Sequence, residues 1–266
     1  MKTVLVTGAT DGIGRETARQ LLERGWHVLL HGRNRDKASA ATQAMASAKG
    51  RTTPVWGDLS RMGEVVQLAH QVTQSAAALD VLINNAGVYE PRRRLTVEGF
   101  EMTFAINHFA PFLLTRHLLQ ALTSAAPGRI VNVSSIAHES GRLNLADLNS
   151  SAGYEGYAAY AASKLANVLF TLALARRLDA RQATANALHP GVIATKLLHA
   201  AFNIKGAAVA QGARTSVYLA TAEQTSNATG KYYVDCKEVK PSRLARDEAL
   251  GEGLWQASER LLQPFL

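Results

Sequence analysis

The run Lys2-Thr3-Val4-Leu5-Val6-Thr7-Gly8-Ala9-Thr10-Asp11-Gly12-Ile13-Gly14 decides the fold of this chain. Its first part is short, apolar and rich in β-branched residues, which is typical of a buried strand. Residues 15–22 then have helical character, with Gly25 as a stop signal. A strand, a glycine turn and a helix N-terminus together form an anion site, because the backbone can approach closely and N–H groups face the negative charge. The spacing Gly-x-x-x-Gly-x-Gly differs from the common Gly-x-Gly-x-x-Gly, yet this context favours a pyrophosphate-binding loop over an ordinary tight turn.

The rest of the chain alternates between strands and helices, without a linker, repeat or low-complexity segment. Strands are expected at 26–31, 52–57, 79–84, 129–134, 184–189 and 231–234. Helices are expected at 35–49, 62–78, 97–122, 157–178 and 211–221. Near-continuous apolar strands such as 130–133 indicate burial on both faces. We therefore expect a single α/β domain over residues 1–266. It would be a doubly wound (Rossmann) parallel sheet with helices on both faces and ligands at the carboxyl ends of the strands.

Composition narrows the class of protein. The chain has 266 residues, 47% of them hydrophobic, which suits one large folded core. No apolar run reaches membrane-spanning length, and a strand from residue 2 leaves no room for a signal peptide or an anchor, so a cytoplasmic protein is expected. The one cysteine, Cys236, cannot form an internal disulfide, which fits a reducing compartment.

The net charge of +8 raises the question of nucleic acid. Lysines and arginines are scattered, however, and the one dense cluster is Arg92-Arg93-Arg94. That cluster is either a solvated loop or a basic rim near the mouth of the site. No nucleic-acid partner is expected.

Tyr160 and Lys164, in the run Tyr160-Ala161-Ala162-Ser163-Lys164, are the candidate reactive pair. Side chains four residues apart on a helix project from the same face. An ammonium close to a phenol favours the phenolate and lowers the phenol pKa, which suits a general acid–base residue. Tyr and Lys at this spacing also occur by chance on solvated helices. The pair gains weight from the nucleotide-binding loop.

Cofactor choice is read at the end of the second expected strand, His31-Gly32-Arg33. A carboxylate there would hold the 2′-hydroxyl of NAD and repel a 2′-phosphate. The acidic position falls on Gly32, and the guanidinium of Arg33 suits a phosphate, so the sequence predicts NADP(H). Arg15 is a candidate second contact. If Arg33 is only a solvated loop residue, the missing acid still argues against NAD.

Six motifs, in this order, carry a family resemblance. They are Thr7-Gly8-x-x-x-Gly12-x-Gly14, Asn84-Asn85-Ala86-Gly87, Asn107 in Ile106-Asn107-His108, Ser134-Ser135, Tyr160-x-x-x-Lys164 and Pro190-Gly191-x-x-x-Thr195. With them the chain resembles the short-chain dehydrogenase/reductase superfamily from end to end. Residues 130–135, 163–167 and 230–236 are most similar to the retinol-dehydrogenase-like branch.

The resemblance implies an NADP(H)-dependent oxidoreductase that transfers hydride between nicotinamide and an aldehyde, ketone or alcohol. Tyr160 would be the acid or base, and Lys164 would lower its pKa and hold the nicotinamide ribose. Ser135 would hydrogen-bond the developing alkoxide, and Asn107 would hold a water that links Lys164 to solvent. The implied cofactor-binding residues are Gly8, Thr10, Asp11, Gly12, Ile13, Gly14, Arg33, Asn34, Asp58, Leu59, Asn85, Ala86, Gly87, Tyr160, Lys164, Pro190, Val192 and Thr195.

Three of these residues could instead have purely structural roles. Ser135 could be a turn residue at a strand end. Asn107 could be a polar group inside a helix, satisfied locally. Asp58 could be the N-cap of the helix that begins near Met62.

Two segments are expected to cover the substrate. Ser135 and Tyr160 are 25 residues apart, which is long for the superfamily, and 138–156, with Asp147 and Tyr154, is expected to form a loop over the site. Tyr157 nearby lacks a lysine partner, because Ala161 is its fourth residue onward. Residues 195–211 are expected to form a lid, and its apolar content favours an apolar carbonyl or alcohol, although an amphipathic surface helix explains that content equally well.

The remaining expectations concern partners and alternatives. His108, His138, His189 and His199 lack metal-ligand spacing, so no metal is expected. No membrane anchor is expected, which argues against a membrane-embedded lipid substrate. The superfamily's use of a long helix pair for dimerisation suggests a homo-oligomer. Reduction of a C=C bond, or NADP(H) sensing without turnover, are the alternative functions, and the intact Asn107, Ser135, Tyr160 and Lys164 argue against a sensor.

Overall fold

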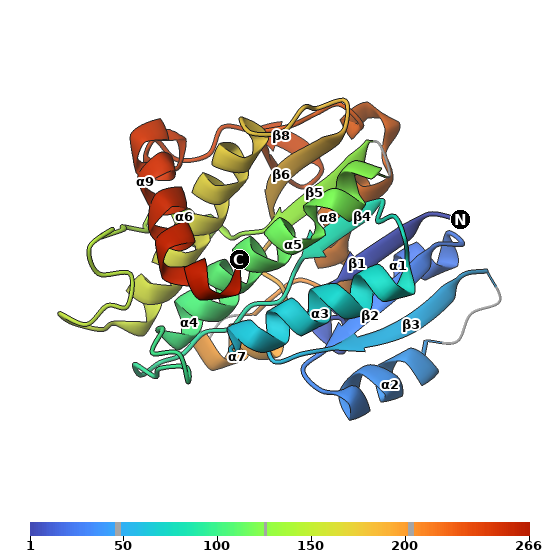
Figure 1. Cartoon of the computed structure of the whole chain (residues 1–266), viewed down its shortest axis with the longest axis horizontal. Coiled ribbons are helices and arrows are strands. Elements are labelled where there is room, and N and C mark those ends of the chain that lie inside the picture. The colour runs from blue at the N-terminus through green and yellow to red at the C-terminus, as the bar shows by residue number, and fades with distance from the viewer. Residues whose placement is uncertain (46–48, 125–126, 202–204) are drawn as a thin grey trace.

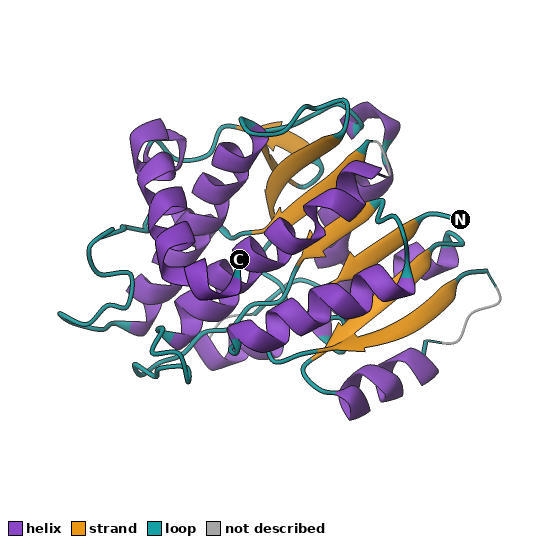
Figure 2. Ribbon diagram, viewed as in Figure 1, coloured by secondary structure: helices purple, strands orange, loops and turns teal. Residues whose placement is uncertain are grey.

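The computed structural model describes residues 1–45, 49–124, 127–201 and 205–266. Its centre is an eight-stranded sheet with helices on both faces (Figures 1 and 2). The spatial order of the strands is β3 (Arg51–Trp56), β2 (His27–Gly32), β1 (Thr3–Val6), β4 (Val81–Asn84), β5 (Gly128–Val133), β6 (Ala183–His189), β7 (Lys231–Val234) and β8 (Lys237–Val239). All neighbouring pairs are parallel except β7 with β8. The doubly wound sheet expected from the sequence is confirmed.

Helices follow most strands and return the chain to the next one. They are α1 (Gly12–Glu23), α2 (Arg35–Gln43), α3 (Met62–Ser75), α4 (Met102–Phe104), α5 (Ala110–Ser124), α6 (Gly156–Ala175), α7 (Lys196–Ala201), α8 (Val209–Thr221) and α9 (Glu248–Leu262). A π-helical turn, Ala105–Phe109, joins α4 to α5, and short 3-10 helices occupy Ile136–Glu139, Glu223–Thr225, Leu244–Arg246 and Gln263–Phe265.

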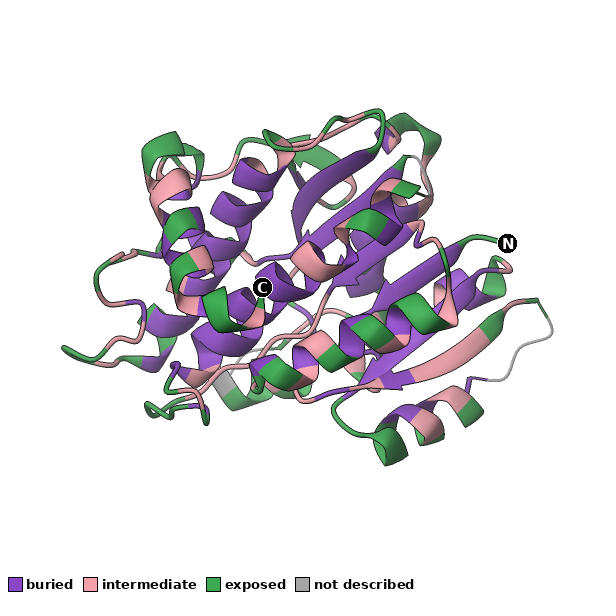
Figure 3. Cartoon of the chain, viewed as in Figure 1, coloured by how far each residue is buried: buried purple, intermediate pink, exposed green. Residues whose placement is uncertain are grey.

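Alternation along the strands creates two cores, one on each face of the sheet. Val4 and Val6 of β1 face the core that includes residues of α1 and α8. Leu5 faces the other core, which includes residues of α3, α5, α6 and α9. Strands β1, β2, β4, β5 and β6 are therefore buried along their whole length, whereas β8 at one edge of the sheet is exposed, as are the outer faces of the helices (Figure 3). This burial explains the near-continuous apolar strands.

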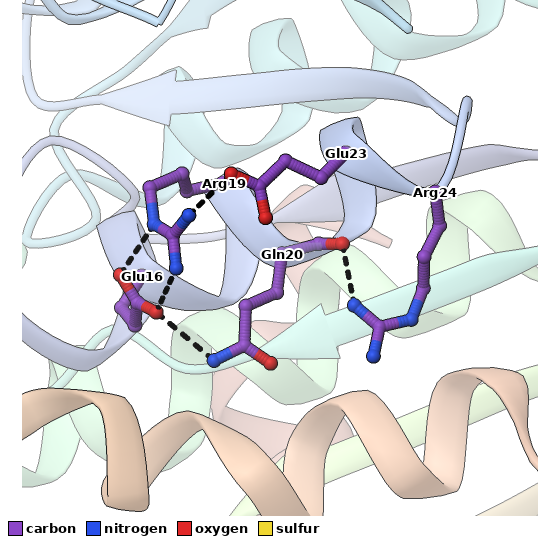
Figure 4. A network of polar contacts seen from close by, with 5 residues as sticks. All are labelled: Glu16, Arg19, Gln20, Glu23 and Arg24. Atoms are coloured by element: carbon purple, nitrogen blue, oxygen red, sulfur yellow. Dashed lines mark hydrogen bonds and ion pairs between the residues drawn. The ribbon is translucent and has the colours of Figure 1, made fainter. Parts of the chain in front are cut away.

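The outer face of α1 carries a network of charged and polar side chains (Figure 4). Arg19 forms ion pairs with Glu16, at 2.6 Å, and with Glu23. Gln20 donates to Glu16, and Arg24 donates to the backbone carbonyl of Gln20. Pairs three and four residues apart support a helix from its solvent side.

Several expected boundaries are wrong. The helix expected at 97–122 begins at Met102, because Gly99 has φ +82°, a Leu95–Glu101 bridge closes a turn, and Glu101 caps the helix by accepting from Thr103 and Phe104 N–H. The helix expected at 35–49 ends at Gln43, and residues 46–48 lie outside the described part. Helix α9 and strand β8 were not expected from the sequence, whereas α7 lies in segment 195–211, for which a surface helix was one of two expectations.

The expectation that no apolar run reaches membrane-spanning length is wrong for helix α6. In the described part of the chain, its 20 residues are long and apolar enough to cross a membrane, by length and hydropathy alone. Its apolar window is 78% buried in the fold, where α6 packs against α9 and β6. Such burial is the behaviour of a core helix, and this helix carries Tyr160 and Lys164.

Candidate active site

A cavity of about 510 Å³ brings together residues that follow the carboxyl ends of β1, β2, β4, β5 and β6. The strand order reverses between β1 and β4, and such a switch point is where open α/β sheets bind ligands. The glycine loop lines one end of the cavity, and Ser135, Tyr160 and Lys164 line the other. Of the residues predicted for the site, all except Asn34 and Asn107 line this cavity.

The glycine loop has little room for side chains. Gly8 has φ +63°, and Gly12 has φ +54°, a region that L side chains rarely adopt. A Cβ on Gly14 would lie 2.3 Å from both Asn85 Nδ2 and the Gly8 carbonyl oxygen. Asp11 caps α1 by accepting from Gly12 N–H at 2.8 Å. No residue in the first turn of α1, which the structure describes in full, is acidic. The free N–H groups and the positive end of the helix dipole therefore suit an anion.

The end of β2 presents two exposed cations to the cavity, Arg33 and Lys37. Lys37 was not expected here from the sequence, and Arg15, the candidate second contact, does not line the cavity. A side chain at position 32 has no space, because a Cβ on Gly32 would lie 2.8 Å from the Ala38 backbone nitrogen. Asn34 does not line the cavity, because it caps α2 by accepting from Lys37 N–H at 3.0 Å.

Buried His31 is a further missed residue at this end of the cavity. Its Nδ1 accepts from Gly8 N–H at 3.0 Å, and its Nε2 lies 2.9 Å from the Gly57 carbonyl oxygen. Burial lowers the pKa of His31 to about 4, so the ring is neutral and donates through Nε2. No sequence pattern marks this contact, because it joins three separate strand ends.

Asp58 lines the cavity but does not cap α3. Its carboxylate accepts from the Ser60 N–H at 2.9 Å and from the Ser60 hydroxyl at 2.8 Å. Helix α3 begins at Met62, and Glu98 accepts from the Met62 N–H at 2.8 Å. The N-cap alternative for Asp58 is therefore wrong.

Tyr160 and Lys164 lie on α6 and are both buried. The Lys164 Nζ lies 5.5 Å from the centroid of the Tyr160 ring and donates to the Val133 carbonyl oxygen at 3.1 Å. Burial raises the pKa of Tyr160 to about 12, and a hydrogen bond with Ser135 acts in the opposite direction. Burial also lowers the pKa of Lys164 to about 8. In this structure the phenol pKa is therefore raised, contrary to the sequence-based expectation, because desolvation dominates and the ammonium is directed at Val133.

The two serines after β5 have different partners. Ser135 lines the cavity, and its Oγ accepts from Ala137 N–H at 3.2 Å, so it also caps the short helix Ile136–Glu139. Ser134 donates through Oγ to the Lys164 carbonyl oxygen at 2.8 Å and thereby ties α6 to the strand end. Ser135 is therefore both a turn residue at the end of a strand and a residue that lines the cavity.

Asn107 is fully buried in the π-helical turn and reaches across the fold. Its Oδ1 accepts from Val88 N–H at 2.8 Å, and its Nδ2 donates to Val88 O and Ser163 Oγ at 3.0 and 2.9 Å. These partners are distant in sequence, so the locally satisfied alternative is wrong. A Cβ on Gly87 would lie 3.3 Å from Lys164 Nζ and 3.4 Å from Asn107 Oδ1, so the space between these two groups depends on glycine.

The expected lid lies partly over the cavity. Thr195, Leu197 and Leu198 line it, and Lys196 forms a 2.5 Å ion pair with Asp11 of the glycine loop. An Ile193–Ala207 bridge connects Ile193, just before this segment, to Ala207 within it. Residues 202–204 of the expected lid lie outside the described part of the chain.

The 138–156 segment covers less of the site than expected. Asp147 accepts from Ser151 and Ala152 N–H within its own turn, and Tyr154 donates to the Glu90 carbonyl oxygen at 2.7 Å. Neither residue lines the cavity, although Tyr157 does. The apolar lining comes instead from Val88, Ile106, Ile136, Ala137, Ile193, Leu197 and Leu198.

The arginine cluster 92–94 and the possible metal ligands were also located in the structure. Arg92, Arg93 and Arg94 do not line the cavity, and Arg93 donates to the Asn149 carbonyl oxygen. Among the described residues, no three or more His, Cys, Asp or Glu side chains form a group that could hold a metal ion. The absence of a metal stays a prediction.

Comparisons with known proteins agree with this geometry. The family model for the short chain dehydrogenase matches residues 2–205. The chain is 40% identical to human retinol dehydrogenase 14, over 97% of this chain and 85% of the human protein. A crystal structure of an uncharacterised protein from Mycobacterium paratuberculosis superposes with a TM-score of 0.82 at 36% identity, covering 99% and 94% of the two chains. The RhlG/NADP active-site complex from Pseudomonas aeruginosa has a TM-score of 0.71 at 25% identity, covering 87% and 93%.

The chain belongs to the short-chain dehydrogenase/reductase family, in its retinol-dehydrogenase-like branch. It is an oxidoreductase of this family, whose members use nicotinamide cofactors.

Proposed function

We propose that this protein is an NADP(H)-dependent oxidoreductase that transfers hydride between nicotinamide and an aldehyde, ketone or alcohol, with Tyr160 as acid and base. One observation carries the proposal. The Tyr160 phenol, the Ser135 hydroxyl and the Lys164 ammonium line one end of a cavity whose other end is the glycine loop. A nicotinamide dinucleotide would use both ends, with its pyrophosphate at the glycine loop and its nicotinamide near Tyr160.

The residues at the first end fit a phosphorylated cofactor. The pyrophosphate would lie at the N-terminus of α1, and a 2′-phosphate would be held by Arg33 and Lys37. Position 32, where NAD-dependent relatives of this fold would place a carboxylate, has no space for any side chain. The P. aeruginosa relative with bound NADP supports the same choice. When bound, the cofactor supplies or accepts the hydride.

The residues at the second end fit proton transfer. With its pKa raised to about 12, the Tyr160 phenol holds its proton at neutral pH, which is the form that protonates a carbonyl oxygen. The Ser135 hydroxyl would donate a hydrogen bond to the same oxygen as charge develops on it. Loss of the phenol proton creates a phenolate near Lys164, whose positive charge stabilises it. We infer that a water between Lys164 and Asn107, beside Gly87, resupplies the proton.

The substrate would be largely apolar. Ile136, Ala137, Leu197 and Leu198 line the cavity, and Ala137 and Leu197 pack with Tyr160 in one hydrophobic cluster. Few polar side chains occur there to pair with additional hydroxyl or charged groups, and unpaired polar groups are costly to bury. We further propose that residues 195–211 close over the bound substrate.

The test is the loss of NADPH absorbance on purified protein with a panel of apolar aldehydes, ketones and quinones, with NADH in parallel. Turnover of an aldehyde or ketone, faster with NADPH at equal concentration, is the expected result. Binding of NADPH without turnover of any panel member would favour the sensor alternative. Saturation of a conjugated C=C bond with the carbonyl retained would favour the alternative reaction.

A further inference from the structure

Two buried histidines hold the peptide unit that follows Ser135. The Ser135 carbonyl oxygen lies 2.8 Å from His138 Nδ1, and the Ile136 N–H donates to His189 Nδ1 at 3.2 Å. These two groups belong to the same peptide bond. The plane that sets the backbone angle ψ of Ser135 is therefore fixed at both its oxygen and its nitrogen.

The partners determine the protonation of both rings. A carbonyl oxygen only accepts, so His138 Nδ1 carries the hydrogen, while its Nε2 accepts from the Ser242 N–H at 3.2 Å. His189 accepts at Nδ1, so its hydrogen is on Nε2. Burial keeps the pKa of His138 below its usual value and that of His189 at about 4, so both rings are neutral near pH 7.

We propose that His138 and His189 are positioning residues, which fix the Ser135 hydroxyl through the Ser135–Ile136 peptide and connect it to the C-terminal segment of the chain. The proposal rests on the function proposed above. Neither histidine needs to touch the reacting atoms, because both act on the backbone that carries Ser135.

The connection to the C-terminal segment runs through His138. Its ring packs on Tyr232 of β7, with 4.8 Å between the ring centroids, and its Nε2 accepts from Ser242, 104 residues later in the sequence. Both supports lie beyond residue 205, where the match to the family model ends. The C-terminal segment of this chain thus supports the serine that would bind the developing alkoxide.

The expected effect follows from geometry. Ser135 has extended angles, φ −159° and ψ 159°, and its Oγ accepts from the Ala137 N–H, whose position follows from the Ser135–Ile136 peptide. A reacting group displaced by about 1 Å costs on the order of a hundredfold in rate, so a partial loss of restraint should cost about tenfold. Because Ser135 would stabilise the transition state, kcat should fall while KM stays within about twofold.

The experiment compares His138→Phe, which keeps a ring but loses both hydrogen bonds, with His138→Asn, whose amide can donate from the Nδ1 position. We expect kcat to fall about tenfold in the first variant and to recover most of that loss in the second. NADPH affinity should be unchanged in both. His189→Leu and His189→Asn form a second, independent pair, which tests the proposal if His138→Phe does not fold.

A double-mutant cycle with Ser135→Ala separates positioning from a general structural role. If His138 acts through Ser135, His138→Phe should have no further effect on kcat in the Ser135→Ala background. An undiminished tenfold loss there would overturn this inference while leaving the proposed function intact. Wild-type turnover that survives Tyr160→Phe, or no turnover at all, would overturn the proposed function and this inference with it.

Discussion

The two ends of the cavity are built in different ways. The glycine-loop end consists mainly of backbone groups from residues 8–14, together with buried His31 and the exposed cations Arg33 and Lys37. The Tyr160 end consists of buried polar side chains whose partners come from distant segments, as Asn107 with Val88 and Ser163 illustrates. The first end selects a ligand by charge and shape, and the second holds proton-transferring groups in fixed positions. The comparison predicts that single changes have graded effects at the first end and severe effects at the second.

The largest effect is expected at Tyr160. Tyr160→Phe removes the proton donor without changing the ring, so kcat should fall about a thousandfold, with NADPH affinity within about twofold. Steady-state kinetics and fluorescence titration measure the two quantities. Tyr157→Phe is the matched control, because Tyr157 also lines the cavity but lies outside the Tyr160–Lys164 pair, and its effect on kcat should be far smaller. Equal losses in the two variants would remove Tyr160 from its special role.

Gly14→Ala tests the glycine-loop end, where the backbone itself is the binding group. The added Cβ would lie 2.3 Å from the Gly8 carbonyl oxygen, so the loop must shift, at a cost of about 3 kcal/mol or more in the free energy of unfolding. NADPH affinity should fall as well. Gly63→Ala in α3 is the control, because its Cβ would meet nothing within 4 Å, and helix propensity predicts a gain of about 0.5–1 kcal/mol. Chemical denaturation of both variants measures the difference.

Acid should weaken the glycine-loop end through His31. Its pKa is lowered from 6.5 to about 4 in the folded chain, so the unfolded state takes up the proton first as the pH falls. The stability contributed by neutral His31 is complete above pH 6.5 and is lost between about pH 6.5 and 4, by up to about 3 kcal/mol. Urea denaturation across this range should show a steeper loss for the wild type than for His31→Gln. Parallel curves would contradict the assignment.

Cofactor preference should respond to the exposed cations in a graded way. Replacing Arg33 by Ala should weaken NADPH binding about tenfold, and the double change with Lys37→Ala should weaken it about a hundredfold. NADH affinity should stay within about twofold, because the 2′-phosphate alone is affected. Isothermal titration at fixed ionic strength provides both constants. A parallel loss of NADH affinity would show that these residues do not read the phosphate.

The smallest effect is expected outside the cavity, in the exposed network of Figure 4. Arg19→Ala removes the ion pairs with Glu16 and Glu23. The Arg19 side chain is 47% exposed and the Glu23 side chain 53% exposed. Exposed pairs of this kind contribute less than about 1 kcal/mol, and salt should reduce that further. Thermal melts at low and high salt would measure it, and kcat should not change. A large change in kcat would connect α1's outer face to the site and weaken the comparison.

The sequence predicts the glycine-loop end better than the Tyr160 end, for a physical reason. Residues 8–14 form a contiguous motif, so a strand, a turn and a helix N-terminus are visible in a short stretch. Tyr160 and Lys164 were indicated by their spacing on a helix and Ser135 by family resemblance, but the contacts of all three depend on the packed fold. The pKa of Tyr160 depends on burial that only the packed fold reveals. His138 and Ser242 are 104 residues apart, and no local pattern marks their contact.

The same reasoning applies to the fold. Strands β1, β2, β4 and β5 were visible as short, largely apolar runs, because burial on both faces leaves a strong local signal. Helix α9 was missed, although Trp255 packs against Phe112 and Phe170 in the core. Asn34, which the resemblance implies for cofactor binding, caps α2 through its side chain, and its contact with a cofactor stays a prediction.

The central claim is direct hydride transfer at the Tyr160 end of the cavity, and isotope transfer tests it most directly. The purified protein would be given NADPH deuterated at both C4 positions and an apolar aldehyde or ketone that it turns over, and the product would be analysed by mass spectrometry and NMR. The account predicts a single deuterium on the carbinol carbon and none on the hydroxyl oxygen after exchange. An alcohol product without deuterium on that carbon would contradict it.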